Sequence, residues 1–284
     1  MALLTVPEIV QLFPVFKGKL GYRVANMLRK HLSVDKVSDV EDRNCMFRGA
    51  DFADACLDDL RIDVQVGNPE RLASLPEGPF ITISNHPYGG VDGIILIDLI
   101  GHLRSEFKVI VNEFLSHIES LHPSMIFVNP KIDDNSVITP TNLQGIREIM
   151  RHLRNGSPVG IFPSGAVSDL HPHERRIYDR EWQPSILRII QRAKVPVVPI
   201  RFFDRNSLFF YLLGLISWKI RVLRLPTEII NKVGTSHRIG IGKTISVKEQ
   251  SLHQDLKSFG KFLRDSVYGM PLPETFRSRK EIIR

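Results

Sequence analysis

Residues 79–92 of this chain read Pro-Phe-Ile-Thr-Ile-Ser-Asn-His-Pro-Tyr-Gly-Gly-Val-Asp, and residues 93–100 continue Gly-Ile-Ile-Leu-Ile-Asp-Leu-Ile. The apolar run that ends at Ser84 is typical of a buried strand. The apolar run after Asp92 predicts the start of a helix. The turn between them therefore places a histidine at a strand end and a carboxylate six positions later.

His86 and Asp92 flank a turn that contains Gly89 and Gly90. Glycine adopts backbone angles that other residues disfavour, so this chain can fold back and bring the carboxylate to the imidazole. A carboxylate at one ring nitrogen fixes the tautomer and leaves the other nitrogen free to accept a proton. The pattern therefore indicates a general base. The competing interpretation is a surface loop or a cap, which is the more common meaning of a lone His–Asp pair.

Two later segments support the catalytic interpretation. Residues 159–168 read V-G-I-F-P-S-G-A-V-S, a short apolar strand followed by a turn that can expose backbone N–H groups. Residues 195–200 read V-P-V-V-P-I, another buried strand, which ends at Arg201. In this order the three motifs resemble those of the glycerolipid acyltransferases, the superfamily that includes 1-acyl-glycerol-3-phosphate acyltransferase, over about residues 75–245.

The chain also departs from the common pattern of that superfamily. The spacer between the histidine and the aspartate, residues 87–91, is one residue longer than usual. The third motif lacks both the Glu and the Arg of F-P-E-G-T-R-S, and residues 126–131, I-F-V-N-P-K, lack the Arg of the second motif. These features are closer to the bacterial branch, sometimes called hemolysin-like, that O-acylates aminolipids such as lyso-ornithine lipid and N-acyl-glycine lipids.

The resemblance implies a role for each motif. His86 would be the general base and Asp92 would orient it, while Ser164 and Gly165 would lie in the oxyanion and acyl-donor region. Acceptor-binding candidates are Phe127, Asn129, Lys131, Arg201 and Arg205. The acyl donor would be acyl carrier protein or a coenzyme A thioester, with no metal and no bound cofactor.

The acceptor follows from what the motifs lack. A phosphomonoester is best bound by a forked arginine, and the second motif offers Asn129 and Lys131 instead. We therefore expect a lysolipid acceptor of the 3-hydroxyacyl aminolipid type, with 1-acyl-glycerol-3-phosphate as the alternative. Two other classes stay open: a non-catalytic lipid- or carrier-binding protein, and a hydrolase that uses the same base on water.

Composition limits the partners. The 284 residues carry 38 Lys and Arg against 31 Asp and Glu, a net charge of +7, which favours an anionic partner. The basic residues do not alternate with aromatic residues, which argues against nucleic acid. Two cysteines without metal-type spacing and an N-terminus without a signal-peptide pattern predict a cytoplasmic protein. The longest uncharged apolar run, residues 207–218, is too short to span a bilayer.

Strands and helices are predicted to alternate from Phe80 onward, which predicts an α/β fold with a single central, largely parallel or mixed sheet flanked by helices. One helix is expected from about Glu113 and another over residues 207–220, and residues 171–174 are expected to form an exposed polar loop. Residues 1–70 are expected to form a helical segment that faces a membrane, because Leu20, Val24 and Met27 recur at helical spacing among basic residues. Packing of this helix on the core is the alternative. Residues 71–270 would form the acyltransferase domain and 271–284 a loosely held charged tail. The expected location is the inner face of the cytoplasmic membrane, as a peripheral protein.

Overall fold

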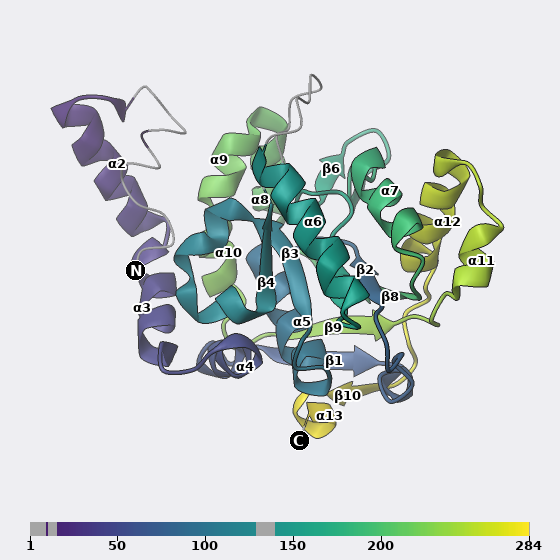
Figure 1. The fold of residues 1–284 in the computed structure, drawn as a ribbon. Coiled ribbons are helices and arrows are strands. Elements are labelled where there is room, and N and C mark those ends of the chain that lie inside the picture. The colour runs from purple at the N-terminus through teal and green to yellow at the C-terminus, as the bar shows by residue number, and fades with distance from the viewer. Residues whose placement is uncertain (1–9, 11–15, 129–139, 284) are drawn as a thin grey trace.

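The computed structural model describes residues 10, 16–128 and 140–283. Its centre is an eight-stranded sheet with the order β10-β1-β9-β8-β2-β5-β3-β4, and a two-stranded hairpin, β6–β7, lies apart from it (Figure 1). The strands are β1 (Asp63–Gly67), β2 (Ile81–Ser84), β3 (Lys108–Asn112), β4 (Met125–Val128), β5 (Val159–Ile161), β6 (Asp169–His171), β7 (Arg176–Tyr178), β8 (Val197–Phe202), β9 (Ser236–Ile241) and β10 (Phe276–Ser278).

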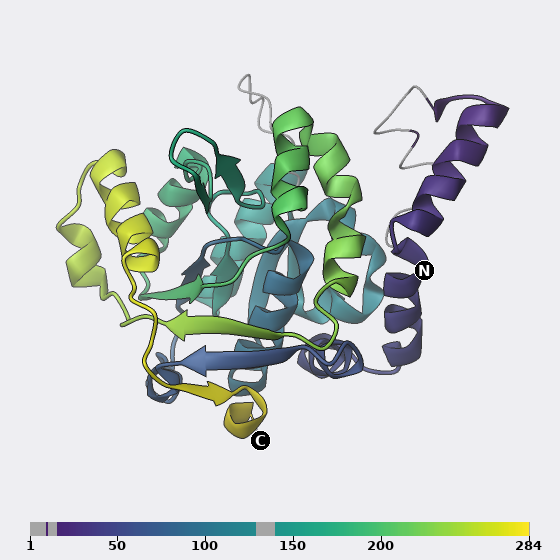
Figure 2. The ribbon, with the colours of Figure 1, turned by 180° about the vertical axis from the view of Figure 1, so that it is seen from behind.

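Helices flank the sheet and extend beyond it (Figures 1 and 2). The α-helices are α2 (Lys19–His31), α3 (Val34–Asn44), α4 (Gly49–Asp59), α5 (Gly90–Leu103), α6 (Pro140–Arg154), α7 (Pro184–Ala193), α8 (Leu208–Ile216), α9 (Trp218–Leu223), α10 (Leu225–Ile230), α11 (Val247–Ser251), α12 (Leu256–Tyr268) and α13 (Lys280–Ile283). Three short 3-10 segments are η2 (Pro69–Arg71), η3 (Glu113–His117) and η4 (Glu119–Ser124).

The sheet is mixed, and its parallel part carries the motifs. Strands β8, β2, β5, β3 and β4 run parallel to one another, whereas β9 is antiparallel to β8 and β10 is antiparallel to β1. Because parallel strands end at the same edge, the segments that follow β2, β5 and β8 meet there. Each of the three motifs found in the sequence contributes one of these segments.

Two apolar clusters cover the two faces of the sheet. Phe52, Ile95 and Ile229, from α4, α5 and α10, belong to one buried cluster. A second cluster contains residues of α6, α7 and α12, among them Ile190 and Phe259. Both faces of the parallel strands are therefore largely buried, which explains why these strands are mostly apolar instead of alternating.

The predicted α/β fold with a single mixed sheet is confirmed. Strand β1 lies before the division expected near residue 70, and β10 lies after the one expected near residue 271. The two strands pair with each other, so the sheet includes residues from all three expected segments. The tail expected to be loosely held also contains Arg279, which is 1% exposed. The Arg279 guanidinium pairs with Asp54 of α4 and lies 2.9 Å from Asp98 of α5.

The exposed polar loop expected at residues 171–174 is present as the turn of the β6–β7 hairpin. Two local predictions were wrong. A helix was expected from about Glu113, where the chain forms η3 and η4. The single helix expected over residues 207–220 is divided into α8 and α9 by Ser217, whose backbone is extended at φ −162° and ψ 129°.

The N-terminal helix α2 stands out from the body of the molecule, at the end where α8 and α9 also project (Figures 1 and 2). Its side chains Leu20, Tyr22 and Met27 are about half exposed or more. Within the described residues, no helix combines the length and the apolar character needed to cross a bilayer. Contact of this end with a membrane stays a prediction.

Candidate active site

The turn of residues 85–92, the candidate catalytic turn, begins at the carboxyl end of β2. Asn85 is buried and continues the sheet with its side chain: its amide donates to the Phe202 carbonyl at 2.9 Å, and its oxygen accepts the Phe202 N–H at 2.8 Å. The side chain therefore pairs with β8 where backbone pairing has ended. This pairing places His86 at the sheet edge in a defined orientation.

Gly89 allows the turn to close. Its φ of +90° and ψ of −119° lie in a region that other residues rarely adopt. A Cβ at this position would lie 2.9 Å from Leu225 and 3.3 Å from Val167. The turn therefore requires glycine both for its backbone angles and for its close neighbours.

Asp92 connects the turn to helix α5. Its Oδ2 accepts the N–H groups of Tyr88 at 2.9 Å and Gly89 at 3.0 Å, so the carboxylate caps the helix from its third position. A negative charge is favourable at a helix N-terminus. Burial raises the pKa of Asp92, and the contacts with His86, Tyr88 and Gly89 oppose that rise.

The same carboxylate orients His86. Nδ1 of the imidazole lies 2.8 Å from Asp92 Oδ2, and the side chains are 18% and 0% exposed, respectively. No described residue forms a hydrogen bond with Nε2 of His86. The imidazole therefore presents one nitrogen to a buried carboxylate, and the other has no hydrogen-bond partner among the described residues, which is the arrangement of an oriented general base.

The third motif packs against this histidine. The Phe162 ring stacks on the imidazole with centroids 4.1 Å apart and an interplanar angle of 29°. The Ser168 N–H donates to the His86 carbonyl at 2.9 Å. Buried Asp179 accepts the His86 N–H at 3.1 Å and the Ser168 hydroxyl at 2.6 Å. Ser168, in the loop after β5, and Asp179, directly after β7, thus hold the two backbone polar groups of His86.

Ser164 and Gly165 form the tip of this loop. The Ser164 hydroxyl is buried and donates to the Ala166 carbonyl at 2.8 Å, and the Gly165 N–H donates to the Phe162 carbonyl at 2.9 Å. Gly165 has φ +64°, and a Cβ there would lie 2.1 Å from the Gln183 amide nitrogen. The Ser164 hydroxyl and the Gly165 N–H therefore bond within the turn, whereas the Ser164 carbonyl accepts the Gln183 amide at 3.2 Å.

A buried polar cluster lies behind Tyr88. The Tyr88 hydroxyl lies 3.1 Å from His237 Nδ1, its carbonyl accepts the Asn206 amide at 3.2 Å, and the Lys232 ammonium lies 4.8 Å from its ring centroid. Burial lowers the pKa of Lys232 to about 8 and that of His237 to about 4. At neutral pH this cluster therefore pairs a cationic lysine with a neutral histidine close to buried Asp92.

The acceptor-binding candidates are not brought together. Phe127 lies on β4, three strands from β2, or about 14 Å at the usual strand spacing. The Arg201 guanidinium donates to the carbonyls of Tyr268 and Met270 at 2.5 Å and so closes the end of α12. Arg205 is exposed and precedes Asn206, which binds the catalytic turn. Asn129 and Lys131 lie outside the described residues.

Sequence reasoning missed Asp179, Lys232 and Arg221. Arg221 is 3% exposed, and it contacts the carbonyls of the third-motif loop. Asp179 and Arg221 come from segments far from the groups they contact and belong to no recognisable motif, whereas residues 228–232 resemble the aminolipid branch without indicating a role for Lys232. The residues next to Arg221 and Lys232 in the sequence are apolar, which indicates that both segments are buried. This pattern does not indicate which group either side chain contacts.

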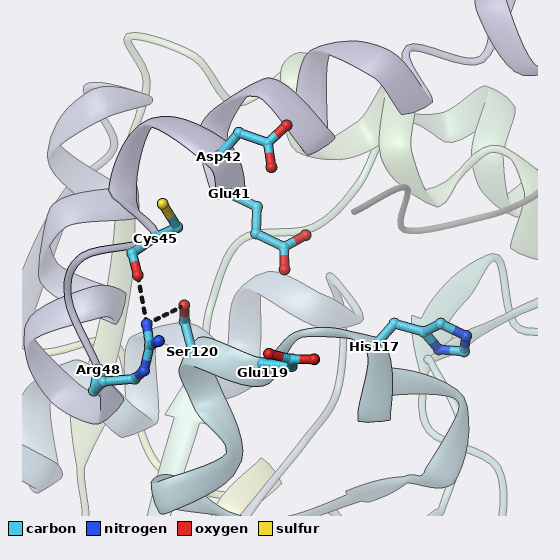
Figure 3. A pocket seen from close by; sticks show the side chains of 7 residues that line it. All are labelled: Glu41, Asp42, Cys45, Arg48, His117, Glu119 and Ser120. Carbon is cyan, nitrogen blue, oxygen red and sulfur yellow. Dashed lines mark hydrogen bonds between the residues drawn. The ribbon is translucent and has the colours of Figure 1, made fainter.

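A separate pocket of about 200 Å³ lies between α3 and η3–η4 (Figure 3). Its lining is polar, and Arg48 on one side donates to the Cys45 carbonyl and to the Ser120 hydroxyl. The residues that line it are Glu41, Asp42, Cys45, Arg48, His117, Glu119 and Ser120. None of them belongs to the catalytic turn or to the third-motif loop.

Comparison with known proteins adds the family. The family model described as "Acyltransferase" matches residues 14–272. The chain belongs to this acyltransferase family. It is therefore an enzyme that transfers acyl groups, and the family predicted from the sequence motifs is confirmed.

Individual relatives are more distant. A lyso-glycine lipid O-acyltransferase of Bacteroides thetaiotaomicron is 27% identical over 252 residues, covering 86% of this chain and 89% of that protein. A lyso-glycine lipid O-acyltransferase of Phocaeicola vulgatus is 29% identical over 228 residues, covering 78% of this chain and 77% of that protein. Among solved structures, the 1-acyl-sn-glycerophosphate acyltransferase PlsC of Thermotoga maritima is similar with a TM-score of 0.47 and 15% identity, covering 81% and 76%.

The pair His86–Asp92 yields a direct prediction. Asp92→Asn keeps an oxygen for the helix cap but presents an amide N–H to Nδ1, so the imidazole is left with its proton on Nε2. We expect the rate of acyl transfer to fall by about 10²–10⁴-fold in Asp92→Asn and at least as far in His86→Ala. Thermal unfolding should show that both variants are folded. The matched control is Asp59→Asn, which removes a carboxylate at the end of α4 that pairs with Arg43 of α3. Wild-type turnover in Asp92→Asn would contradict the orienting role.

Proposed function

We propose that this acyltransferase moves a fatty acyl group from a thioester to the hydroxyl of a lysolipid. The observation that supports this most strongly is Nε2 of His86, which has no partner among the described residues and belongs to a ring held between Asp92 and Phe162. The reaction joins an acceptor hydroxyl to a thioester carbonyl and calls for a positioned base to remove the hydroxyl proton. The names of the two curated relatives support a lysolipid as the acceptor.

In this mechanism Nε2 takes the proton of the acceptor hydroxyl as its oxygen attacks the thioester carbonyl carbon. The carbon–sulfur bond of the tetrahedral intermediate then breaks, and the departing thiolate receives the proton from the imidazolium. Asp92 stabilises the imidazolium without being protonated itself. The donor is acyl carrier protein or a coenzyme A thioester, each of them an anionic partner for a chain of net charge +7.

The oxyanion of the intermediate needs fixed donors. The Gly165 N–H is already bonded to Phe162, so it is not available in this conformation. The N–H of Val167, two residues further along the loop, has no acceptor in the described part of the chain. Its side chain lies beside Gly89 of the catalytic turn, which makes this amide the donor we favour.

For the acceptor we favour a 3-hydroxyacyl aminolipid with a single carboxylate. Arg201 is bonded to the end of α12, so exposed Arg205 beside the catalytic turn is the cation best placed for a carboxylate. Both curated relatives carry aminolipid names, which supports the same choice.

A competition assay tests the acceptor. The purified protein is given one acyl carrier protein thioester and equal amounts of N-(3-hydroxyacyl)glycine and lysophosphatidic acid, and the products are measured by mass spectrometry. We expect O-acylation of the glycine lipid to dominate, with neither product formed by His86→Ala. Preferential formation of phosphatidic acid would contradict the aminolipid assignment. Thioester loss without either product would point to a hydrolase, and binding without turnover to a non-catalytic protein.

We also propose that the protein binds the inner face of the cytoplasmic membrane as a peripheral protein. Helix α8 exposes an apolar row, and Trp218 extends it into α9; the row comprises Leu208, Phe209, Leu212, Leu215 and Ile216. The inner face of α8 contacts the site, because the Tyr211 hydroxyl donates to the Pro87 carbonyl at 2.8 Å. A bilayer against this row would bring a lipid acceptor close to His86.

Vesicle binding tests this surface. We expect anionic vesicles to capture the protein more than neutral ones, and added salt to reduce that capture because it screens the charges. Ile216→Glu, at a side chain 76% exposed on α8, should weaken capture, whereas Leu252→Glu, at a side chain 75% exposed next to α11, should not. Equal losses in both variants, or no loss in either, would argue against α8 as the contact surface.

A further inference from the structure

Arg221 is a buried cation next to the third-motif loop. It lies on α9 and is 3% exposed. One terminal nitrogen, Nη1, donates to the Ser168 carbonyl at 3.1 Å and to the Asp169 carboxylate at 2.5 Å. The other, Nη2, donates to the Val167 carbonyl at 3.4 Å. A single guanidinium therefore contacts three consecutive residues of the loop that follows Ser164 and Gly165.

Helix α8 encloses Arg221 from the opposite side. The guanidinium carbon lies 5.5 Å from the Phe210 ring centroid. A Cβ at Gly214 would lie 2.9 Å from Cδ of Arg221, so the absence of a side chain there makes room for the arginine stem. A charge enclosed in this way is costly unless it is paired. Its partners are the carboxylate and the carbonyls of the loop.

The third-motif loop is in turn bonded to the backbone of His86. Ser168, whose carbonyl Arg221 binds, donates its N–H to the His86 carbonyl at 2.9 Å. The Ser168 hydroxyl bonds to Asp179 at 2.6 Å, and the same Asp179 oxygen accepts the His86 N–H at 3.1 Å. Both backbone polar groups of His86 are therefore bonded to the group of residues that Arg221 holds in place.

We propose that Arg221 is a positioning residue for acyl transfer, which fixes the third-motif loop and through it the imidazole of His86. The inference rests on the function proposed above, in which His86 is the base. The third motif has no charged side chain of its own between Phe162 and Ser168, so α9 supplies the cation that organises it. Lysine cannot replace this arginine fully, because a point charge lacks the fork that reaches several acceptors at once.

Steady-state kinetics of four proteins test the proposal: wild type, Arg221→Met, Arg221→Lys and Lys219→Met. The last removes a cation from the same helix without touching the loop. With a detergent-dispersed acceptor, we expect Arg221→Met to lower kcat by about 10²-fold with little change in KM, since small displacements of a catalytic group cost about this much. Arg221→Lys should recover part of kcat, and Lys219→Met should match wild type.

Hydrogen exchange supplies a readout that does not depend on turnover. The Ser168 amide, protected in wild type by the His86 carbonyl, should exchange faster in Arg221→Met and remain protected in Lys219→Met. A folded Arg221→Met with wild-type kcat, or with a defect confined to KM, would overturn the proposal. Unchanged protection of the Ser168 amide would do the same.

Two outcomes need separate treatment. If Arg221→Met does not fold, Arg221→Lys and Asp169→Asn carry the test, because each weakens the same contact; wild-type kcat in both would overturn the proposal. If His86→Ala retains activity, the proposed base is wrong and the proposed function fails with it. Loss of activity in His86→Ala together with an unaffected Arg221→Met refutes the role of Arg221 alone.

Discussion

The site depends on one buried carboxylate. Asp92 is fully enclosed, caps helix α5 through the amides of Tyr88 and Gly89, and lies 2.8 Å from the imidazole of His86. The cap and the catalytic contact therefore use the same oxygen, so the position of the histidine is tied to the start of a buried helix. The close packing around Gly89 makes this geometry hard to change without disturbing the fold.

Around this carboxylate, elements from distant parts of the chain converge on the catalytic turn. The loop after β5 stacks Phe162 on the imidazole and bonds its backbone, β8 pairs with Asn85, and α8 reaches the turn through Tyr211. Helix α8 thus has two faces with different neighbours: the inner face contacts the site, and the outer face exposes apolar side chains to solvent. In the function we propose, this helix separates the chemistry from the lipid surface that supplies the acceptor.

The sequence predicted the parts of the structure that local patterns specify. The turn from His86 to Asp92 was found because glycines, histidine and aspartate lie within a few residues of one another. Asp179 and Arg221 were missed, because they lie 93 and 53 residues from the groups they bind and only tertiary folding brings them there. The helix predicted after Glu113 was wrong because buried Ile118 and Leu121, three residues apart, also suit 3-10 geometry, and Pro123 does not favour a longer helix. The break at Ser217 likewise follows from tertiary structure, since α9 turns its Arg221 toward the loop.

The central claim is that Asp92 holds His86 as a base with its free nitrogen at Nε2. Nitrogen-15 NMR of the imidazole, recorded on the free protein at a pH where the ring is neutral, measures this directly. The proposed arrangement predicts that the proton resides on Nδ1, facing Asp92, and that Nε2 is unprotonated. A neutral ring with its proton mainly on Nε2 would contradict it, because that tautomer cannot accept the proton of an acceptor hydroxyl at the open side of the site.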